Sequence, residues 1–278
     1  MAGKLYVVGT PIGNLGDFSP RAVETLSSVD FIAAEDTRVT LKLLNHLGIK
    51  KSLVSYYEHN KAFKGDKIVE RILAGETCAQ VSDAGSPAIS DPGEDLVKKS
   101  VAAGIRVCAI PGPCAAITAL SISGQSTGRF CFEGFLSTAR KSRREHLESL
   151  KKEHRTMIFY EAPHKLANTL DDLKETFGGD RPVSLCRELT KLHEEVIRTN
   201  LQGAVDYYRE NSPKGEFVLI VAGAPEEAEE TASSEDAALR VAALMDQGLS
   251  RKDAIRQTAQ ELGLPKNTVY EAALKVQE

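Results

Sequence analysis

Four short segments have the residue types of ligand-binding loops that follow buried strands. Gly9–Asn14 combines two glycines with a proline, which gives a tight turn whose backbone can lie close to a ligand. Ser82–Gly93 adds a carboxylate, Asp83, to a long turn. Ile110–Ala116 leads into a helix whose small residues leave room for a flat group, and Phe159–His164 has the same form. These loops predict recognition of a small molecule.

Two of these loops also fit other interpretations. The first has glycines at the spacing G-x-x-x-G-x-x-G, followed some way along the chain by Glu35 and Asp36, as in a dinucleotide site. That spacing differs from the dinucleotide fingerprint, and Pro11 lacks the N–H that a phosphate would use. The second half of the Ser82–Gly93 loop resembles a helix start, with Ser90 or Asp91 as N-cap and Pro92 in the first turn.

The elements that position the first three loops are predicted to form a parallel sheet. Short apolar runs, each ended by Gly, Pro or Asp, alternate with amphipathic stretches in residues 1–120. The expected strands are Lys4–Gly9, Phe31–Glu35, Cys78–Ser82 and Arg106–Ile110. Alternation of strand and helix indicates a mostly parallel α/β sheet, whose ligands bind at the carboxyl ends of the strands.

The rest of the chain has three parts that differ in composition and in their predicted elements. Residues 121–223 are expected to form a second α/β domain with a mixed sheet, its strands at Phe130–Leu136, Thr156–Tyr160, Val183–Cys186, Glu195–Thr199 and Glu216–Ala222. Residues 224–233 are acidic and poor in large apolar groups, as in a flexible linker. Residues 234–278 predict three short helices, with Ser250 as an N-cap and Pro265 in a first turn. This module resembles a helix-turn-helix.

Composition limits the class of protein. The formal net charge is −4, so a protein with an overall basic field is excluded and any nucleic-acid contact must use a local patch. Apolar runs such as Phe217–Ala224 are too short to span a bilayer, and no signal peptide is evident, so a cytoplasmic protein without a membrane partner is expected. The five cysteines form no C-x-x-C pair, so we expect reduced thiols and no metal site.

Eight segments in register carry a resemblance. They are VGTPIGNLGD, AEDTR, SDAGSPAISDPG, PGPCAA, FEGFL, FYEAPHK, CRELTKLHEE and KGE. Together, over about residues 4–223, they resemble the tetrapyrrole methylase superfamily, and within it the ribosomal RNA small subunit methyltransferase I branch. The C-terminal helices resemble the terminal module of that branch. Cys114, Ser137 and Ala162 depart from the usual residues of the motifs.

The resemblance implies S-adenosylmethionine as cofactor, bound in a cleft between two α/β domains. Carried over by motif, the cofactor-binding residues would be Pro11, Asp83, Ala84, Gly85, Pro87, Ala88, Cys114, Ala115 and Tyr160. The implied acceptor is the ribose 2'-hydroxyl of a cytidine in 16S ribosomal RNA of the small subunit. The branch also implies a homodimer.

A ribose hydroxyl is a poor nucleophile at neutral pH, so a base or a cation should lie beside it. Charged residues at motif positions are Glu35, Asp36, Arg38, Arg187, Glu188 and Lys191. We expect Glu188 to act as base, with Arg187 and Arg38 placing phosphate or ribose. The alternative is that these residues only form ion pairs.

A basic segment supplies the expected RNA contact. Arg140–Arg155 is rich in Lys and Arg, and helical spacing turns Leu147 and Leu150 inward. The predicted RNA-binding side chains are Arg140, Arg143, Arg144 and Lys151. A solvated helix would look similar.

Two other functions remain open at this point. A methylase of a tetrapyrrole, of the uroporphyrinogen or precorrin type, would share the fold but has no evident use for the basic segment and the helical module. A nucleic-acid-binding regulator would use the C-terminal helices, although residues 234–278 carry about as many acids as bases.

Overall fold

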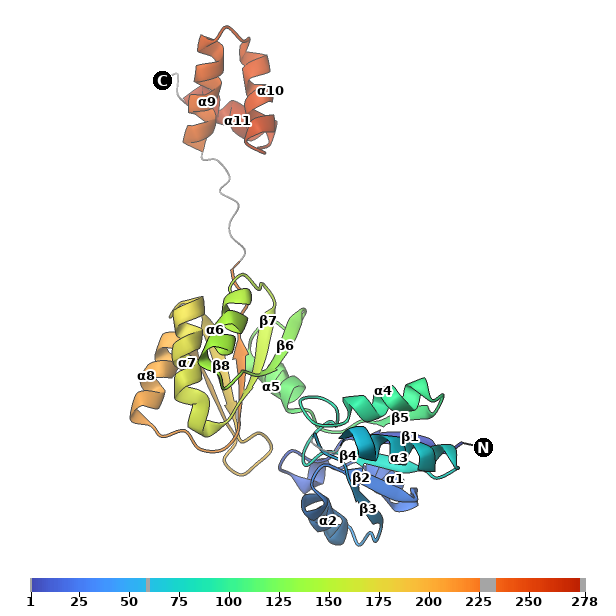
Figure 1. The fold of residues 1–278 in the computed structure, drawn as a ribbon. Helices are drawn as coiled ribbons and strands as arrows, with labels where there is room; N and C mark the ends of the chain where they lie inside the picture. The colour runs from blue at the N-terminus through green and yellow to red at the C-terminus, as the bar shows by residue number, and fades with distance from the viewer. Residues whose placement is uncertain (1, 59–60, 226–233, 276–278) are drawn as a thin grey trace. The chain divides into compact units, whose positions relative to one another are not determined.

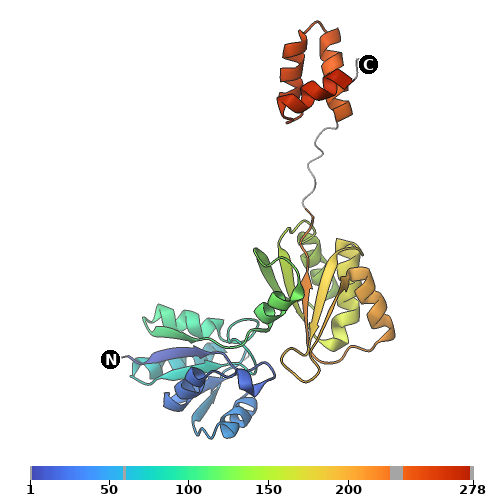
Figure 2. The same cartoon turned by 180° about the vertical axis from the view of Figure 1, so that it is seen from behind.

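The computed structural model describes residues 2–58, 61–225 and 234–275. The chain divides into two compact units, Met1–Ala224 and Pro225–Glu278, which we describe separately (Figures 1 and 2). Nearly all of the predicted linker, residues 224–233, lies outside the described residues.

The first sheet of the large unit is wholly parallel, as predicted. Its strands β1 (Lys4–Val8), β2 (Phe31–Ala34), β3 (Ser52–Ser55), β4 (Cys78–Val81) and β5 (Arg106–Ile110) lie in the order β3-β2-β4-β1-β5. Helices α1 (Pro20–Ser28) and α2 (Thr37–His46) pack on one face, and α3 (Lys61–Leu73) and α4 (Glu94–Ala102) on the other (Figure 1). Along β2, Ile32 and Ala34 face one core and Phe31 and Ala33 the other. Both faces of the sheet are therefore buried, as in other parallel sheets.

The second sheet is mixed, which also agrees with the sequence. Its strands β6 (Phe130–Phe135), β7 (Thr156–Glu161), β8 (Pro182–Arg187), β9 (Glu195–Asn200) and β10 (Phe217–Val221) lie in the order β6-β7-β10-β8-β9. Only the β6–β7 pair is parallel in this sheet. One face is covered by α6 (Arg140–Ser149), α7 (Pro163–Phe177) and α8 (Leu201–Glu210). The other face packs against α5 (Ala115–Ser123), which crosses the predicted domain boundary at residue 120.

Three details differ from the sequence predictions. The strand β3 was not predicted, because its four residues include two serines and are mostly half-exposed. Helix α4 begins at Glu94 with Gly93 as its N-cap, so Ser90, Asp91 and Pro92 belong to the preceding loop and not to a helix start. Helix α6 ends at Ser149, so Lys151 lies in the following turn.

The small unit has its own apolar core. Helices α9 (Ser234–Asp246), α10 (Arg251–Glu261) and α11 (Lys266–Lys275) pack around fully buried Ala237, Ala254 and Val269. The Ser250 hydroxyl accepts a hydrogen bond from the Asp253 amide at 3.3 Å, which confirms the predicted cap. Within the described residues, no helix has both the length and the apolar character needed to cross a membrane.

Candidate active site

Three strand-end loops of the first sheet, which follow β1, β4 and β5, are in backbone contact. Thr10 and Gly85 form an isolated antiparallel bridge, with N–H to O distances of 2.8 and 3.1 Å between the two residues. Gly9 and Gly112 approach so closely that a Cβ on Gly9 would lie 2.7 Å from the Cα of Gly112. Only glycine fits at these two positions, because any side chain there would overlap the neighbouring backbone.

The loop between β4 and α4 holds several residues in the left-handed region. Gly85 and Gly93 have φ of 76° and 143°, and the non-glycine residues Ala88 and Ser90 have φ of 70° and 62°. Left-handed backbone is strained for alanine and serine, and such strain is concentrated at functional sites. The Gly85 amide and carbonyl are both bonded to Thr10. Gly85 therefore offers a ligand its Cα surface and not its backbone polar groups.

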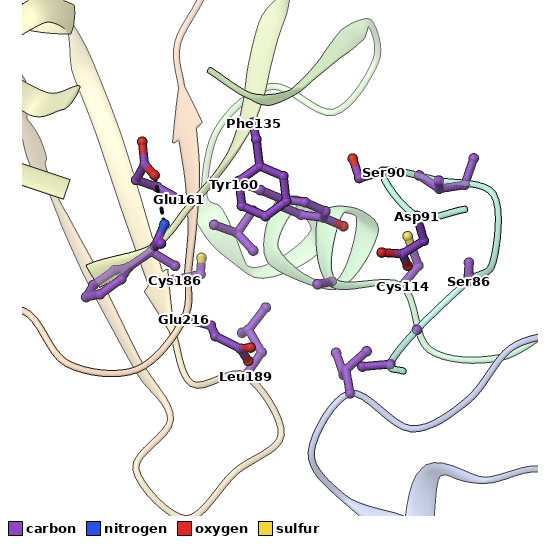
Figure 3. A pocket seen from close by; sticks show the side chains of 18 of the residues that line it. Ser86, Ser90, Asp91, Cys114, Phe135, Tyr160, Glu161, Cys186, Leu189 and Glu216 are labelled. Atoms are coloured by element: carbon purple, nitrogen blue, oxygen red, sulfur yellow. Dashed lines mark hydrogen bonds between the residues drawn. The ribbon is translucent and has the colours of Figure 1, made fainter. Parts of the chain in front are cut away.

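A cavity of about 470 Å³ lies where these loops meet the second sheet (Figure 3). Its volume is in the range of small-molecule sites, roughly 300–1,000 Å³. Among the predicted cofactor residues, the cavity is lined by Ala84, Gly85, Cys114, Ala115 and Tyr160. The remaining predictions, Pro11, Asp83, Pro87 and Ala88, lie in the same loops but are not among the described lining residues.

Aromatic rings form one wall of the cavity. The Tyr160 ring makes edge contacts with Phe132 and Phe135, with centroids 5.0 and 5.4 Å apart. The Tyr160 hydroxyl accepts a hydrogen bond from the Ala116 amide at 3.1 Å, in the first turn of α5. Burial raises the pKa of Tyr160 to about 12, so the hydroxyl is neutral at physiological pH. Tyr160 thus links β7 to the N-terminus of α5, and its ring lines the cavity.

The charged groups that line the cavity are carboxylates. They are Asp91, Glu161 and Glu216, and no Lys or Arg is among the described lining residues (Figure 3). Glu161 is buried and accepts hydrogen bonds from the Ala162 amide at 2.8 Å and the Thr169 hydroxyl at 2.5 Å, which fixes it at the start of α7. Because the Glu161 carboxylate faces α7, Asp91 and Glu216 are the acidic side chains that suit a cationic ligand here, and His164 also lines the cavity.

More carboxylates lie beside Asp91. Burial, followed by the charge of Asp83, raises the pKa of Asp91, although a hydrogen bond from Ser82 opposes the shift. Burial also raises the pKa of Glu35, with Asp91 and Asp83 adding to the effect. The Asp83 carboxylate accepts from the Asp36 amide at 3.1 Å. Asp83 thus supports the loop from outside the cavity.

The predicted catalytic residues are not described among the cavity-lining side chains. The Glu188 carboxylate lies 2.9 Å from the Lys191 Nζ and accepts from the Glu216 amide at 2.9 Å. The Lys191 contact is the main cause of a lowered pKa for Glu188. Arg187 pairs with Glu195 on the neighbouring strand at 3.0 Å, and Arg38 is exposed and pairs with Asp36 at 2.6 Å. These contacts favour the ion-pair alternative, and the catalytic roles of all three residues stay predictions.

Lys191 connects this loop to the cavity and to the first domain. Its Nζ is 2.7 Å from Glu216 Oε2, which belongs to a cavity-lining side chain. Its aliphatic stem lies over Gly13, where an added Cβ would be 2.5 Å from Lys191 Cγ. Lys191 is thus a cation in contact with a carboxylate of the cavity lining.

The predicted RNA-binding helix directs much of its charge inward. Arg143, whose side chain is 15% exposed, pairs with the buried Asp172 of α7 at 2.6 Å. Arg144 is held between Asp172 and Glu175. Lys151 pairs with Glu148 at 3.2 Å, and Arg140 is exposed. Arg143 therefore fastens α6 to α7, and RNA binding by the four residues stays a prediction.

Sequence reasoning missed several lining residues. Asp91, Phe135 and Glu216 stand in quoted motifs, and their positions after, at the end of and directly before a strand could have indicated them. Cys186 and Val218 are apolar core residues of the second sheet, and their alternation gives no sign that they also face a cavity. Among the described residues, no group of His, Cys, Asp or Glu side chains is arranged to hold a metal ion.

Comparison with known proteins identifies the class of protein. The model of the Tetrapyrrole (Corrin/Porphyrin) Methylases family matches residues 4–205. Among solved structures, the methyltransferase CobJ has a TM-score of 0.60 at 18% identity, over 80% of this chain and 95% of that one. Uroporphyrin-III-C-methyltransferase from Thermus thermophilus has a TM-score of 0.55 at 19% identity, over 78% and 94%. The chain belongs to the tetrapyrrole methylase family.

Similar sequences narrow the family to one branch. Ribosomal RNA small subunit methyltransferase I of Synechocystis sp. is 50% identical over 99% of both chains. The protein of that name from Halalkalibacterium halodurans is 49% identical, over 96% of this chain and 93% of its own. A model named RsmI C-terminal HTH domain matches residues 231–277. Both parts of the sequence resemblance are thus confirmed, with the chain in the ribosomal RNA small subunit methyltransferase I branch.

Proposed function

We propose that this protein transfers a methyl group from S-adenosylmethionine to the ribose 2'-hydroxyl of a cytidine in small-subunit ribosomal RNA. The observation that carries the proposal is the full-length identity of 49–50% to relatives named for methylation of that RNA. The cytoplasmic location and the homodimer implied by the sequence remain predictions.

The residues of the cavity fit the proposed cofactor. S-adenosylmethionine would supply an electrophilic methyl group on a sulfonium cation. The rings of Phe135 and Tyr160 and the carboxylate of Asp91 provide an aromatic and anionic surface for such a cation. The first turn of α5, which begins after Cys114 without a side-chain cap, offers amides to a carboxylate.

The same charges argue against a tetrapyrrole acceptor. A uroporphyrinogen or precorrin carries many carboxylates and would need cations around it. The described cavity lining has the carboxylates of Asp91 and Glu216, one histidine, His164, and no Lys or Arg. An RNA acceptor needs only one ribose near this cavity, while its phosphates can contact cations elsewhere.

Proton removal has two candidate groups with opposite pKa shifts. Glu188 is held as a carboxylate by Lys191, which makes it a weaker base. Asp91 lines the cavity, and burial raises its pKa, so it is the stronger base and a second candidate. Lys191 is placed to stabilise negative charge near Glu216 at the mouth. Alignment of the acceptor would supply most of the remaining acceleration.

The first test of the proposed function identifies the methylated atom in the RNA product. Small ribosomal subunits or naked small-subunit RNA are incubated with labelled S-adenosylmethionine, and the RNA is then digested with alkali. A 2'-O-methyl group blocks cleavage of the adjacent bond, so resistant bonds are expected and an alkali-sensitive product contradicts ribose methylation.

The base is identified by the pH at which the rate falls. With Asp91 as base, the rate falls at a pH above the usual carboxyl range, and Asp91→Asn removes that step. With Glu188 as base, the fall comes below that range and Glu188→Gln removes it. An unchanged profile in both variants excludes both residues as base.

A further inference from the structure

The C-terminal unit collects its positive charge in one groove. A cavity of about 400 Å³ is lined by Arg251, Lys252, Ile255, Arg256, Lys266 and Tyr270. These residues come from α10 and α11. Five Lys and Arg side chains of this unit are described, and four of them line the groove, whereas the fifth, Arg240, pairs with Glu261 at 2.7 Å. The balanced composition of residues 234–278 therefore hides a local basic surface.

The described lining of the groove favours an anion. No Asp or Glu is among its described lining residues. Arg256 pairs with Asp253 at 3.1 Å, but both side chains are at least half exposed, and such pairs contribute little to stability. Arg251 donates to the Ala273 carbonyl at 3.4 Å. A phosphate can replace the Asp253 contact at low cost.

The groove cations at the N-termini of α10 and α11 lie where the helix dipole does not favour them. Arg251 and Lys252 are the first residues of α10, and Lys266 is the first residue of α11. A cation in the first turn of a helix is disfavoured by the helix dipole. The helix N-termini instead add their own positive potential to that of the side chains.

An aromatic ring completes the groove. Tyr270 is 50% exposed, and Ile255 beneath the groove is 8% exposed. The apolar surface available to a partner is thus mainly one ring, which is small for a protein-docking patch. Sites for single-stranded nucleic acid typically combine cations along the phosphate backbone of the ligand with an exposed aromatic ring on which a base can stack.

We propose that the groove between α10 and α11 binds single-stranded RNA, with Lys252, Arg256 and Lys266 on phosphates and Tyr270 stacked on a base. The proposal deepens the proposed function, because it gives the C-terminal module a direct role in holding the RNA acceptor. It is separate from the cavity that holds the reacting groups.

The test uses full-length protein and matched charge changes. Lys252→Gln with Lys266→Gln removes two positive charges from the groove. The control, Gln247→Glu with Gln260→Glu, changes the net charge by the same amount at exposed sites of the same unit outside the groove. Binding of a labelled, mixed-sequence single-stranded RNA of 20 nucleotides is followed by fluorescence anisotropy from low to physiological salt.

The groove variant is expected to raise the Kd about tenfold at physiological salt and to reduce the slope of log K against log salt by about 1.4. The control should keep the wild-type slope. Equal slopes in the groove variant and the wild type overturn the proposal. The proposal is also overturned if the groove variant no longer binds assembled ribosomal subunits but keeps its affinity for RNA. That result would assign the groove to a ribosomal protein.

Methyl transfer by the same preparations separates this proposal from the proposed function. If RNA binding depends on the groove but the wild type does not methylate ribose, the proposed function is contradicted and the groove proposal is kept. If the wild type methylates ribose but RNA binding does not depend on the groove, the groove proposal is contradicted and the proposed function stands.

Discussion

Helix α6 and the groove between α10 and α11 are both rich in Lys and Arg, but their cations have different partners. On α6, Arg143 and Arg144 contact the carboxylates of Asp172 and Glu175 in the same domain. In the groove, no carboxylate is among the described lining residues, and the Arg256 pair with Asp253 is at least half exposed on both sides, although residues 234–278 carry seven acids against six bases. Local composition therefore does not tell which cations are paired within the protein, and RNA binding by either surface stays a prediction.

The largest expected effect is on stability, at Arg143. Replacement by alanine leaves Asp172, whose side chain is 7% exposed, as a buried carboxylate without its main partner. Loss of one partner of a buried pair costs about 3–5 kcal/mol. Urea unfolding of Arg143→Ala should show this loss, whereas Lys141→Ala, at a side chain 88% exposed, should change little. Near-wild-type stability of Arg143→Ala would return Arg143 to the candidates for RNA contact.

The second effect is on RNA affinity, at Tyr270. Replacement by leucine keeps an apolar side chain but removes the stacking surface, and one stacked base contributes about 1–3 kcal/mol. RNA affinity measured by anisotropy should fall by at least fivefold, with little change in salt dependence because no charge is removed. The control Leu239→Ala, at another exposed apolar position of the unit, should bind as the wild type. A wild-type Kd for Tyr270→Leu removes stacking from the proposal.

A smaller effect on stability is expected at Glu188, whose carboxylate is paired with Lys191. Contact with Lys191 lowers the pKa of Glu188, so it stabilises the fold above the usual carboxyl pKa, and this stabilisation is lost as pH falls through the lowered value. Glu188→Gln should reduce the free energy of unfolding by about 1 kcal/mol at neutral pH. Thermal unfolding across pH should show the difference vanishing in acid. A difference that persists there would mean that charge is not its cause.

The smallest effect is expected at Arg144. Its side chain is 41% exposed, and Asp172 keeps Arg143 as a partner when Arg144 is replaced by alanine. Exposed ion pairs contribute at most about 1 kcal/mol. Urea unfolding of Arg144→Ala should therefore show far less loss than Arg143→Ala. Equal losses would show that the two arginines act as one network, and the α6 surface would then be wholly structural.

The strands and the strand-end loops were predictable because backbone requirements are local. The apolar runs of β1, β4 and β5 form parallel strands as expected, with β4 fully buried, and glycines such as Gly9 and Gly85 stand where a side chain would clash or strain the chain. The short, partly polar β3 gave too weak a signal. These features depend on residues close in sequence, which periodicity and turn preferences describe well.

The contacts of charged side chains were not predictable in the same way. Arg143 and Asp172 are 29 residues apart, and Glu188 meets the Glu216 amide across 28 residues. Pairing over such separations depends on how the elements pack. For the same reason, the sequence did not show which residues of the strand-end loops line the cavity, and the carried-over residues Pro11 and Asp83 are not among the described lining residues.

The position of Tyr160 has a practical consequence for spectroscopy. The chain has seven tyrosines and no tryptophan, so no tyrosine emission is lost by energy transfer to an indole. Tyr160 is the one tyrosine among the described residues that line the cavity, and its hydroxyl is hydrogen-bonded to the Ala116 amide. A ligand that displaces water from this ring is expected to change the emission of Tyr160, and the difference from a Tyr160→Phe variant isolates that signal. Occupancy of the cavity can thus be read optically in unlabelled protein.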